Sequence, residues 1–180
     1  MDNLNITSKA STKYVVECYD NYYRIPFFNI RIWKRKIPKL RWKETFNNIV
    51  VTAGLNKLLD ATIKTGSASP TWYVGLKGSG SIVAADTMAS HAGWSELTPF
   101  SNANRPTYTP GTIASGAVDN SASKAVFNIN ASSTIYGAFL VDNNTKGGTT
   151  GTLYGGGDFA SSRPVVNGDT LNITGTLTIT

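Results

Sequence analysis

The segment Leu171–Ile179 reads LNITGTLTI and carries the strongest indication of fold class in this 180-residue chain. Leu171, Ile173, Gly175, Leu177 and Ile179 alternate strictly with polar residues, so all five fall on one face of an extended strand. A period of two is the signature of a β-strand, because successive side chains point to opposite faces. The segment therefore predicts a strand at the end of the chain.

Shorter segments of the same kind precede it, separated by Gly, Ser, Thr and Asn turns at the spacing of a sandwich or barrel. The expected strands are Lys13–Cys18, Leu40–Val51, Trp72–Leu76, Trp94–Leu97, Ala125–Ile129, Ile135–Val141 and Thr152–Tyr154. One helix is expected at Ala53–Ile63, with Thr52 as its cap and with Leu55, Leu58 and Leu59 on one face. Because helices do not alternate with strands, a parallel sheet is disfavoured.

These elements predict a mainly all-β chain, an antiparallel β-sandwich that is jelly-roll-like or immunoglobulin-like, with one short helix near residues 53–63. Residues 14–180 form this single domain, and residues 1–13 are expected to form a flexible N-terminal arm. A hydrophobic fraction of 41% with a charged fraction of 16% excludes a disordered polyelectrolyte. Without an apolar run of about 18 residues or a signal peptide, we expect a protein made in a cytoplasm and used as made, with no membrane partner.

Positive charge is concentrated in Arg31–Lys43, RIWKRKIPKLRWK, which holds seven Lys or Arg, two Trp and no acid. Residues 1–64 hold twelve basic and five acidic residues, net +7, whereas residues 65–180 hold five and six, net −1. Such a distribution concerns binding partners and not the fold. We call residues 21–43 the basic aromatic extension. Its Pro26 and Pro38 disfavour a helix, so we expect extended chain there.

Three interpretations of the basic aromatic extension compete. It could dock on an acidic protein surface, with Trp33 and Trp42 as anchors. It could be the solvated face of an edge strand, whose lysines discourage unwanted pairing. It could also bind nucleic acid through phosphates and stacked bases. We favour protein docking and place nucleic acid last, since the rest of the chain contains few basic residues.

Residues for catalysis are sparse. His91 is the only histidine, so a two-histidine metal site is excluded, and we interpret it as a hydrogen-bonded residue of a compact turn. That turn spans Asp86–Trp94, with Asp86 as its cap. Cys18 is the only cysteine, which excludes an internal disulfide and a cysteine-based zinc site. We predict that the protein is not an enzyme and needs no cofactor or metal.

Two loops imitate ligand-binding motifs. Asp142–Gly147 begins like a calcium loop, but Lys146 and Leu153 stand where that loop needs ligands, so we predict a hairpin loop. Gly155–Gly157 follows a strand but lacks the lysine of a phosphate-binding loop. We therefore interpret these glycines as a turn that requires positive φ.

Several phrases of the chain resemble a family of small structural proteins of tailed bacteriophages. They occur in family order and cover nearly everything after residue 40, and DTMASHAGW is the most specific of them. The segments are Lys13–Asp20, Leu40–Leu59, Thr71–Leu76, Asp86–Glu96, Arg105–Thr109, Asp119–Ser123, Ile135–Leu140, Gly147–Tyr154 and Asn167–Leu171. In similar sequences a short turn joins the first two segments, whereas this chain inserts Asn21–Lys39.

The resemblance implies a structural virion protein, most closely a capsid decoration or cement protein. Such a protein would lie on the outer capsid surface as a trimer, bind the major capsid protein and stabilise the head. The docking residues that we predict are Phe27, Phe28, Arg31, Trp33, Lys34, Arg35, Lys36 and Arg41. The alternative is a tail, collar or fibre component that binds host glycans through Tyr108, Tyr136 and Tyr154 in loops.

Overall fold

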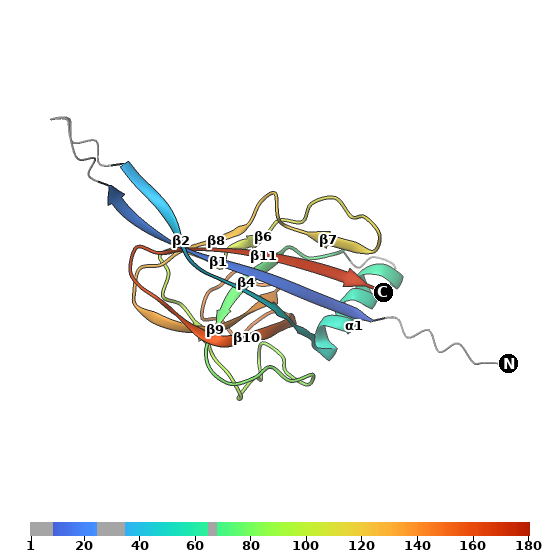
Figure 1. The fold of residues 1–180 in the computed structure, drawn as a ribbon. Helices are drawn as coiled ribbons and strands as arrows, with labels where there is room; N and C mark the ends of the chain where they lie inside the picture. Colours follow the sequence, from blue (N-terminus) through green and yellow to red (C-terminus); the bar gives the residue numbers. More distant parts are fainter. Residues whose placement is uncertain (1–8, 25–34, 65–67) are drawn as a thin grey trace.

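Two antiparallel sheets pack together as a β-sandwich, which confirms the predicted fold class (Figure 1). The computed structural model describes residues 9–24, 35–64 and 68–180, and for residues 21–24 and 35–37 it describes the backbone alone. No helix in this described part is long and apolar enough to cross a membrane.

The first sheet is built around the strand that the sequence indicates most strongly. Its strand order is β2, β1, β11, and both β7 and β8 pair with the far side of β11. The strands are β1 (Ala10–Arg24), β2 (Arg35–Asn47), β7 (Ala117–Asp119), β8 (Ala125–Asn128) and β11 (Thr170–Ile179). β1 and β11 pair over ten residues, from Ala10 with Ile179 to Tyr19 with Thr170. The first and last described strands therefore lie side by side.

The second sheet has the order β3, β10, β9, β4, and β5 and β6 both pair with β4. Its strands are β3 (Ile49–Val50), β4 (Trp72–Lys77), β5 (Glu96–Leu97), β6 (Thr107–Tyr108), β9 (Ser133–Val141) and β10 (Leu153–Val165). The chain changes sheets at Asn48, which separates β2 from β3. That crossing places β2 and β10 at the same side of the sandwich, where Phe46 and Phe159 pack edge to face with ring centroids 5.1 Å apart.

The core lies between the sheets and follows the period-two pattern. Leu171 and Ile173 of β11 are fully buried, together with Tyr14 and Val16 of β1. Residues of the second sheet that join the same cluster are Val74, Leu76, Ile135, Ala138 and Leu140. The pattern predicts that one face of β11 is apolar along its whole length. Ile179 is 59% exposed, however, so the core ends before the strand does.

The prediction of a turn at Gly155–Gly157 is wrong, because these residues lie inside β10. A Cβ atom at Gly156 would lie 2.7 Å from the carbonyl oxygen of Ala138, and one at Gly157 would lie 2.5 Å from the carbonyl oxygen of Asn47. Both distances are too short for any side chain. The glycines are therefore present because other chain segments approach the strand closely, and not because the backbone turns.

The N-terminal boundary also differs from the prediction. Ala10–Lys13 belong to β1 and pair with β11, although we assigned residues 1–13 to a flexible arm. Lys9 and Thr180 continue the ladder by one pair. The backbone nitrogen of Lys9 donates to the carbonyl oxygen of Thr180, and the two atoms are 2.5 Å apart. Residues 1–8 of the predicted arm lie outside the described residues.

The helix α1 (Thr52–Ile63) forms where the sequence predicts it, but its cap and its packed face are different. Val51 is the N-cap residue, in extended conformation, and Thr52 is the first helical residue. Gly54 is buried and Leu58 is half-buried against the core, whereas Leu55 and Leu59 are exposed. The hydropathy pattern could not predict which face of α1 packs on the body, because the closest contact is made by Gly54, which has no apolar side chain.

We expect Gly54→Ala to lower the free energy of unfolding by about 2 kcal/mol, although alanine favours helix over glycine by about 1 kcal/mol. The added Cβ would lie 2.2 Å from the carbonyl oxygen of Tyr154, so α1 would have to move away from β10. Urea unfolding measures the change. Asn56→Ala, at an exposed position of the same helix, is the control and should be neutral or stabilising. Equal stability of the two variants would contradict the close contact.

Candidate functional site

The hairpin formed by β1 and β2 projects from the sandwich (Figure 1). The two strands pair from Lys13 with Asn47 to Arg24 with Arg35, whereas β11 accompanies β1 only as far as Tyr19. Beyond Tyr19 the described hairpin is a two-stranded ribbon without a third strand. We call this ribbon, Asp20–Arg24 with Arg35–Lys39, the hairpin arm.

An ion pair holds the hairpin arm at its base. The register of β1 and β2 shifts between Cys18 and Tyr19, because Arg41 is an extra residue on β2. This bulge accompanies an ion pair in which Arg41 Nη1 donates to Asp169 Oδ2. Asp169 Oδ2 also accepts the backbone N–H of Val166 at 2.9 Å, and the Asp169 side chain is 1% exposed. The turn between β10 and β11 is thus tied to the point where the arm leaves the body.

Cys18 lies beside this ion pair and is not a reactive thiol. Its Sγ donates to Asp169 Oδ2 at 3.6 Å, and its side chain is fully buried. Burial, together with the nearby Asp169 carboxylate, raises the pKa of the Cys18 thiol to about 12. A thiol with that pKa is protonated at neutral pH and is therefore a poor nucleophile.

The five basic residues after residue 65 all have partners within the body. Lys77 and Arg105 are fully buried, and each binds a carboxylate and at least one backbone carbonyl. The contacts are Lys77 with Asp158, Arg105 with Glu96, Lys124 with Glu17, Arg163 with Glu44, and Lys146 with the carbonyls of Phe100 and Asn102. The excess positive charge of the chain therefore belongs to the N-terminal third.

Charges near the base of the hairpin arm are exposed. Lys39 is exposed, and the Lys43 side chain is 53% exposed with its Nζ 3.3 Å from Glu17 Oε1. Hydrogen bonding to Lys124 and then to Lys43 holds the pKa of Glu17 below its usual value. Exposed pairs of this kind contribute little to stability, so these lysines remain available to a partner.

β2 is an edge strand of the first sheet, since β1 is its only pairing partner among the described strands. Pro38, Lys39 and the bulge at Arg41 are features that protect sheet edges from adding another strand. The backbone of β2 is therefore consistent with the interpretation that its basic residues lie on a protected edge strand. Docking through this hairpin would consequently use side chains rather than an added strand.

The predicted docking residues fall into three groups. Phe27, Phe28, Arg31, Trp33 and Lys34 lie outside the described residues. Arg35 and Lys36 belong to β2, where they pair with Arg24 and Tyr23. Arg41 is bound to Asp169, so it positions the hairpin arm from within the protein. The sequence contained no sign of this role, because Asp169 is 128 residues away.

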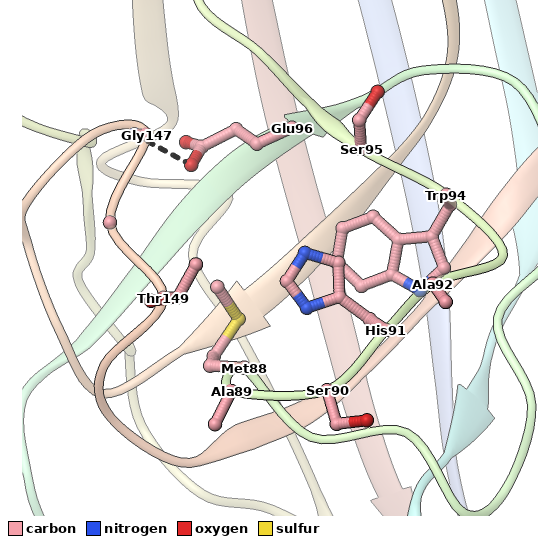
Figure 2. A pocket seen from close by; sticks show the side chains of 11 residues that line it. Met88, Ala89, Ser90, His91, Ala92, Trp94, Ser95, Glu96, Gly147 and Thr149 are labelled. Atoms are coloured by element: carbon pink, nitrogen blue, oxygen red, sulfur yellow. Dashed lines mark hydrogen bonds between the residues drawn. The ribbon is translucent and has the colours of Figure 1, made fainter.

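The DTMASHAGW segment lines an open depression of about 510 Å³ together with residues 147–149 (Figure 2). His91 Nδ1 lies 3.1 Å from the carbonyl oxygen of Thr87, and its ring lies 4.3 Å from that of Trp94. This confirms His91 as a hydrogen-bonded turn residue. The side chain of Asp86 holds this turn through two hydrogen bonds, since its Oδ2 accepts N–H groups from Val83 and from the Trp94 indole.

The depression does not assemble a serine, histidine and acid triad from its lining residues. In Figure 2 the side chains of Ser90 and Ser95 point away from the His91 ring. Glu96 is directed to the opposite wall, where its Oε2 accepts the N–H of Gly147 at 2.7 Å and also binds Arg105. Its carboxylate is therefore used in holding two loops together.

The tyrosines proposed for glycan binding do not form an exposed platform. Tyr108 and Tyr154 are 3% and 2% exposed, and only Tyr136 reaches the surface, at 37%. Tyr108 donates its hydroxyl hydrogen to the carbonyl oxygen of Gly175 at 3.1 Å. Burial raises the pKa of both Tyr108 and Tyr154. The two residues are core groups, which removes the feature that favoured a glycan-binding role.

The loop at Asp142–Gly147 is part of the connection between β9 and β10, as predicted for a hairpin loop. Asp142 Oδ1 accepts the backbone N–H of Thr152 at 2.5 Å, which closes the loop. Among the described residues, no cluster of three or more His, Cys, Asp or Glu side chains could hold a metal.

Comparison with protein-family models finds no match for this chain, and comparison with curated proteins finds none either.

Proposed function

We propose that this protein is a structural component of a tailed-phage virion that decorates the outer capsid surface and binds the major capsid protein through its hairpin arm. One observation carries the proposal: Arg24, Arg35, Lys36 and Lys39 belong to a hairpin that projects from the body, while the five basic residues after residue 65 are bound within the protein. The family resemblance supplies the class of partner.

Residues 21–43 contain eight Lys or Arg and no acid, more positive charge than the whole chain's net +6. A projecting basic ribbon favours an acidic surface and sets the orientation of the encounter. Apolar and aromatic residues would supply most of the affinity, since charge complementarity chiefly governs rate and specificity.

The ion pair at the base gives the hairpin arm a defined direction. Because Arg41 and Asp169 join β2 to the turn before β11, the ribbon leaves the sandwich from a fixed point. A preorganised arm loses less conformational entropy on binding than a free segment does. The same arrangement suits a cement protein, which must resist outward forces on the lattice without rearranging.

The test is co-sedimentation of the purified protein with capsids that lack it, at low and moderate salt. We expect Lys39→Glu/Lys43→Glu to weaken binding at least about tenfold, because acidic residues would then face an acidic surface. Lys9→Glu/Lys13→Glu makes the same change in net charge at exposed positions away from the arm, and should change affinity about twofold or less.

Two results would reject the proposal. One is wild-type protein that stays in the supernatant under both salt conditions, and the other is equal loss of binding in the two double variants. Capsids emptied of DNA should bind equally well, since the proposed partner is protein. Binding that requires DNA and falls steeply with salt would indicate nucleic-acid recognition instead.

A further inference from the structure

The helix α1 presents a partly aliphatic face to solvent. Leu55, Leu59 and Ile63 follow one another at intervals of four residues and are 40%, 61% and 78% exposed. We call these three residues the α1 stripe. The exposed residues of the helix are Thr52, Leu55, Asn56, Leu59, Thr62 and Ile63. The outward side of a surface helix normally carries charged residues, whereas three of the six exposed positions here are aliphatic and the charged side chains of Lys57 and Asp60 lie beside them.

The surface beside the α1 stripe is hollowed and carries both signs of charge on one flank. A hollow of about 370 Å³ is lined by Asn56, Leu59, Asp60, Ile63 and Lys64. Within one copy, Lys64 Nζ lies 2.9 Å from Asp60 Oδ1, one helical turn apart. The hydrogen bond to Asp60 raises the pKa of Lys64. An aliphatic side chain can enter this hollow next to an acid and a base.

We propose that the α1 stripe is a contact between two copies of this chain, with their α1 helices antiparallel across a two-fold axis. In this arrangement Leu59 of one copy packs against Ile63 of the second copy. A two-fold axis of this kind brings the same flank of both helices together, so Asp60 of each copy lies near Lys64 of the other. The surface therefore complements itself in apolar character and in charge.

The contact is small, which determines its strength. A twelve-residue helix is about 18 Å long, and one face of it offers less than the roughly 800 Å² per partner of a standard interface. We expect a dissociation constant of about 100 µM in solution. Copies held side by side on a surface would meet at a far higher effective concentration. A two-fold contact joins two copies, and so it differs from the trimer that the resemblance implies.

Sedimentation equilibrium of the full chain, from about 10 µM to about 1 mM, tests the proposal without any capsid. The wild-type mass should rise from monomer toward dimer over this range. Leu59→Asp should weaken association at least about tenfold, because it buries a carboxylate in the contact. Val126→Asp changes a side chain of β8 that is 40% exposed, and should associate like the wild type.

Exchanging the charges of Asp60 and Lys64 distinguishes the two-fold contact from non-specific hydrophobic association. Asp60→Lys should weaken association, and adding Lys64→Asp should restore it, because the opposite charges would again face each other. A wild-type chain that is monomeric at about 1 mM overturns the proposal. So does a Leu59→Asp variant that dimerises normally, or a wild-type mass that fits a trimer. None of these measurements depends on the hairpin arm, so they leave the proposed capsid binding unaffected.

Discussion

Arg105→Ala is expected to lower the free energy of unfolding by about 4 kcal/mol. The guanidinium group is fully buried and makes two hydrogen bonds with Glu96, at 2.9 Å and 2.6 Å. It also donates to the carbonyl oxygens of Asn143 and Gly148, both at 2.8 Å, and its Cζ lies 5.5 Å from the centre of the Phe139 ring. Alanine would leave the buried carboxylate of Glu96 without its main partner.

Urea unfolding of the variant measures the loss, and two further variants identify its cause. Arg105→Met/Glu96→Leu should recover part of the stability, since no buried charge is left unpaired. Lys124→Ala removes a cation from a more exposed pair with Glu17 and should cost less than about 1 kcal/mol. A similar cost for Arg105→Ala and Lys124→Ala would show that the Arg105 contacts contribute only as surface pairs do.

Arg41→Ala is expected to lower the free energy of unfolding by about 2 kcal/mol and to loosen the base of the hairpin arm. The effect is smaller than at Arg105 because the Arg41 side chain is 29% exposed and water can replace part of the interaction. Asp169 would remain buried with the N–H of Val166 as its strongest remaining donor. The substitution should therefore increase local opening at the base of the hairpin arm more than it promotes unfolding of the whole protein.

The single cysteine reports this local opening. Cys18 is buried next to Asp169, so a thiol reagent should label it faster in Arg41→Ala than in the wild type. Lys39→Ala, two residues away and exposed, is the control and should label at the wild-type rate. Unchanged labelling of Arg41→Ala would mean that the ion pair does not hold the arm, and the argument for a preorganised hairpin would fail.

Local pattern accounts for the elements that were predicted correctly. β4 starts at the predicted Trp72, and β11 covers the predicted Leu171–Ile179 with one additional residue at its start. The helix at residues 53–63 was also predicted within one residue. In each case neighbouring residues alternate or repeat according to the geometry of the element itself, which is information that a short segment contains.

Close approach between distant segments accounts for the errors. Consecutive glycines predict a turn because a turn is their commonest cause, whereas in β10 the backbone of Asn47 and Ala138 leaves no room for side chains. Tyr108 and Tyr154 were placed in exposed loops, but their rings fill the core between the sheets. A residue's neighbours in space, not in sequence, decided each of these cases.

The sequence by itself determined that this is an antiparallel β protein with one helix and with its positive charge in the first third. Hydrophobic periodicity and charge count are properties of the chain, independent of how its segments meet. Only the tertiary structure decided that Arg41 binds Asp169, that the basic residues after residue 65 are bound within the protein, and that the α1 stripe is exposed. Each of these depends on which segments pack together, and in the case of Arg41 and Asp169 that packing joins residues 128 positions apart.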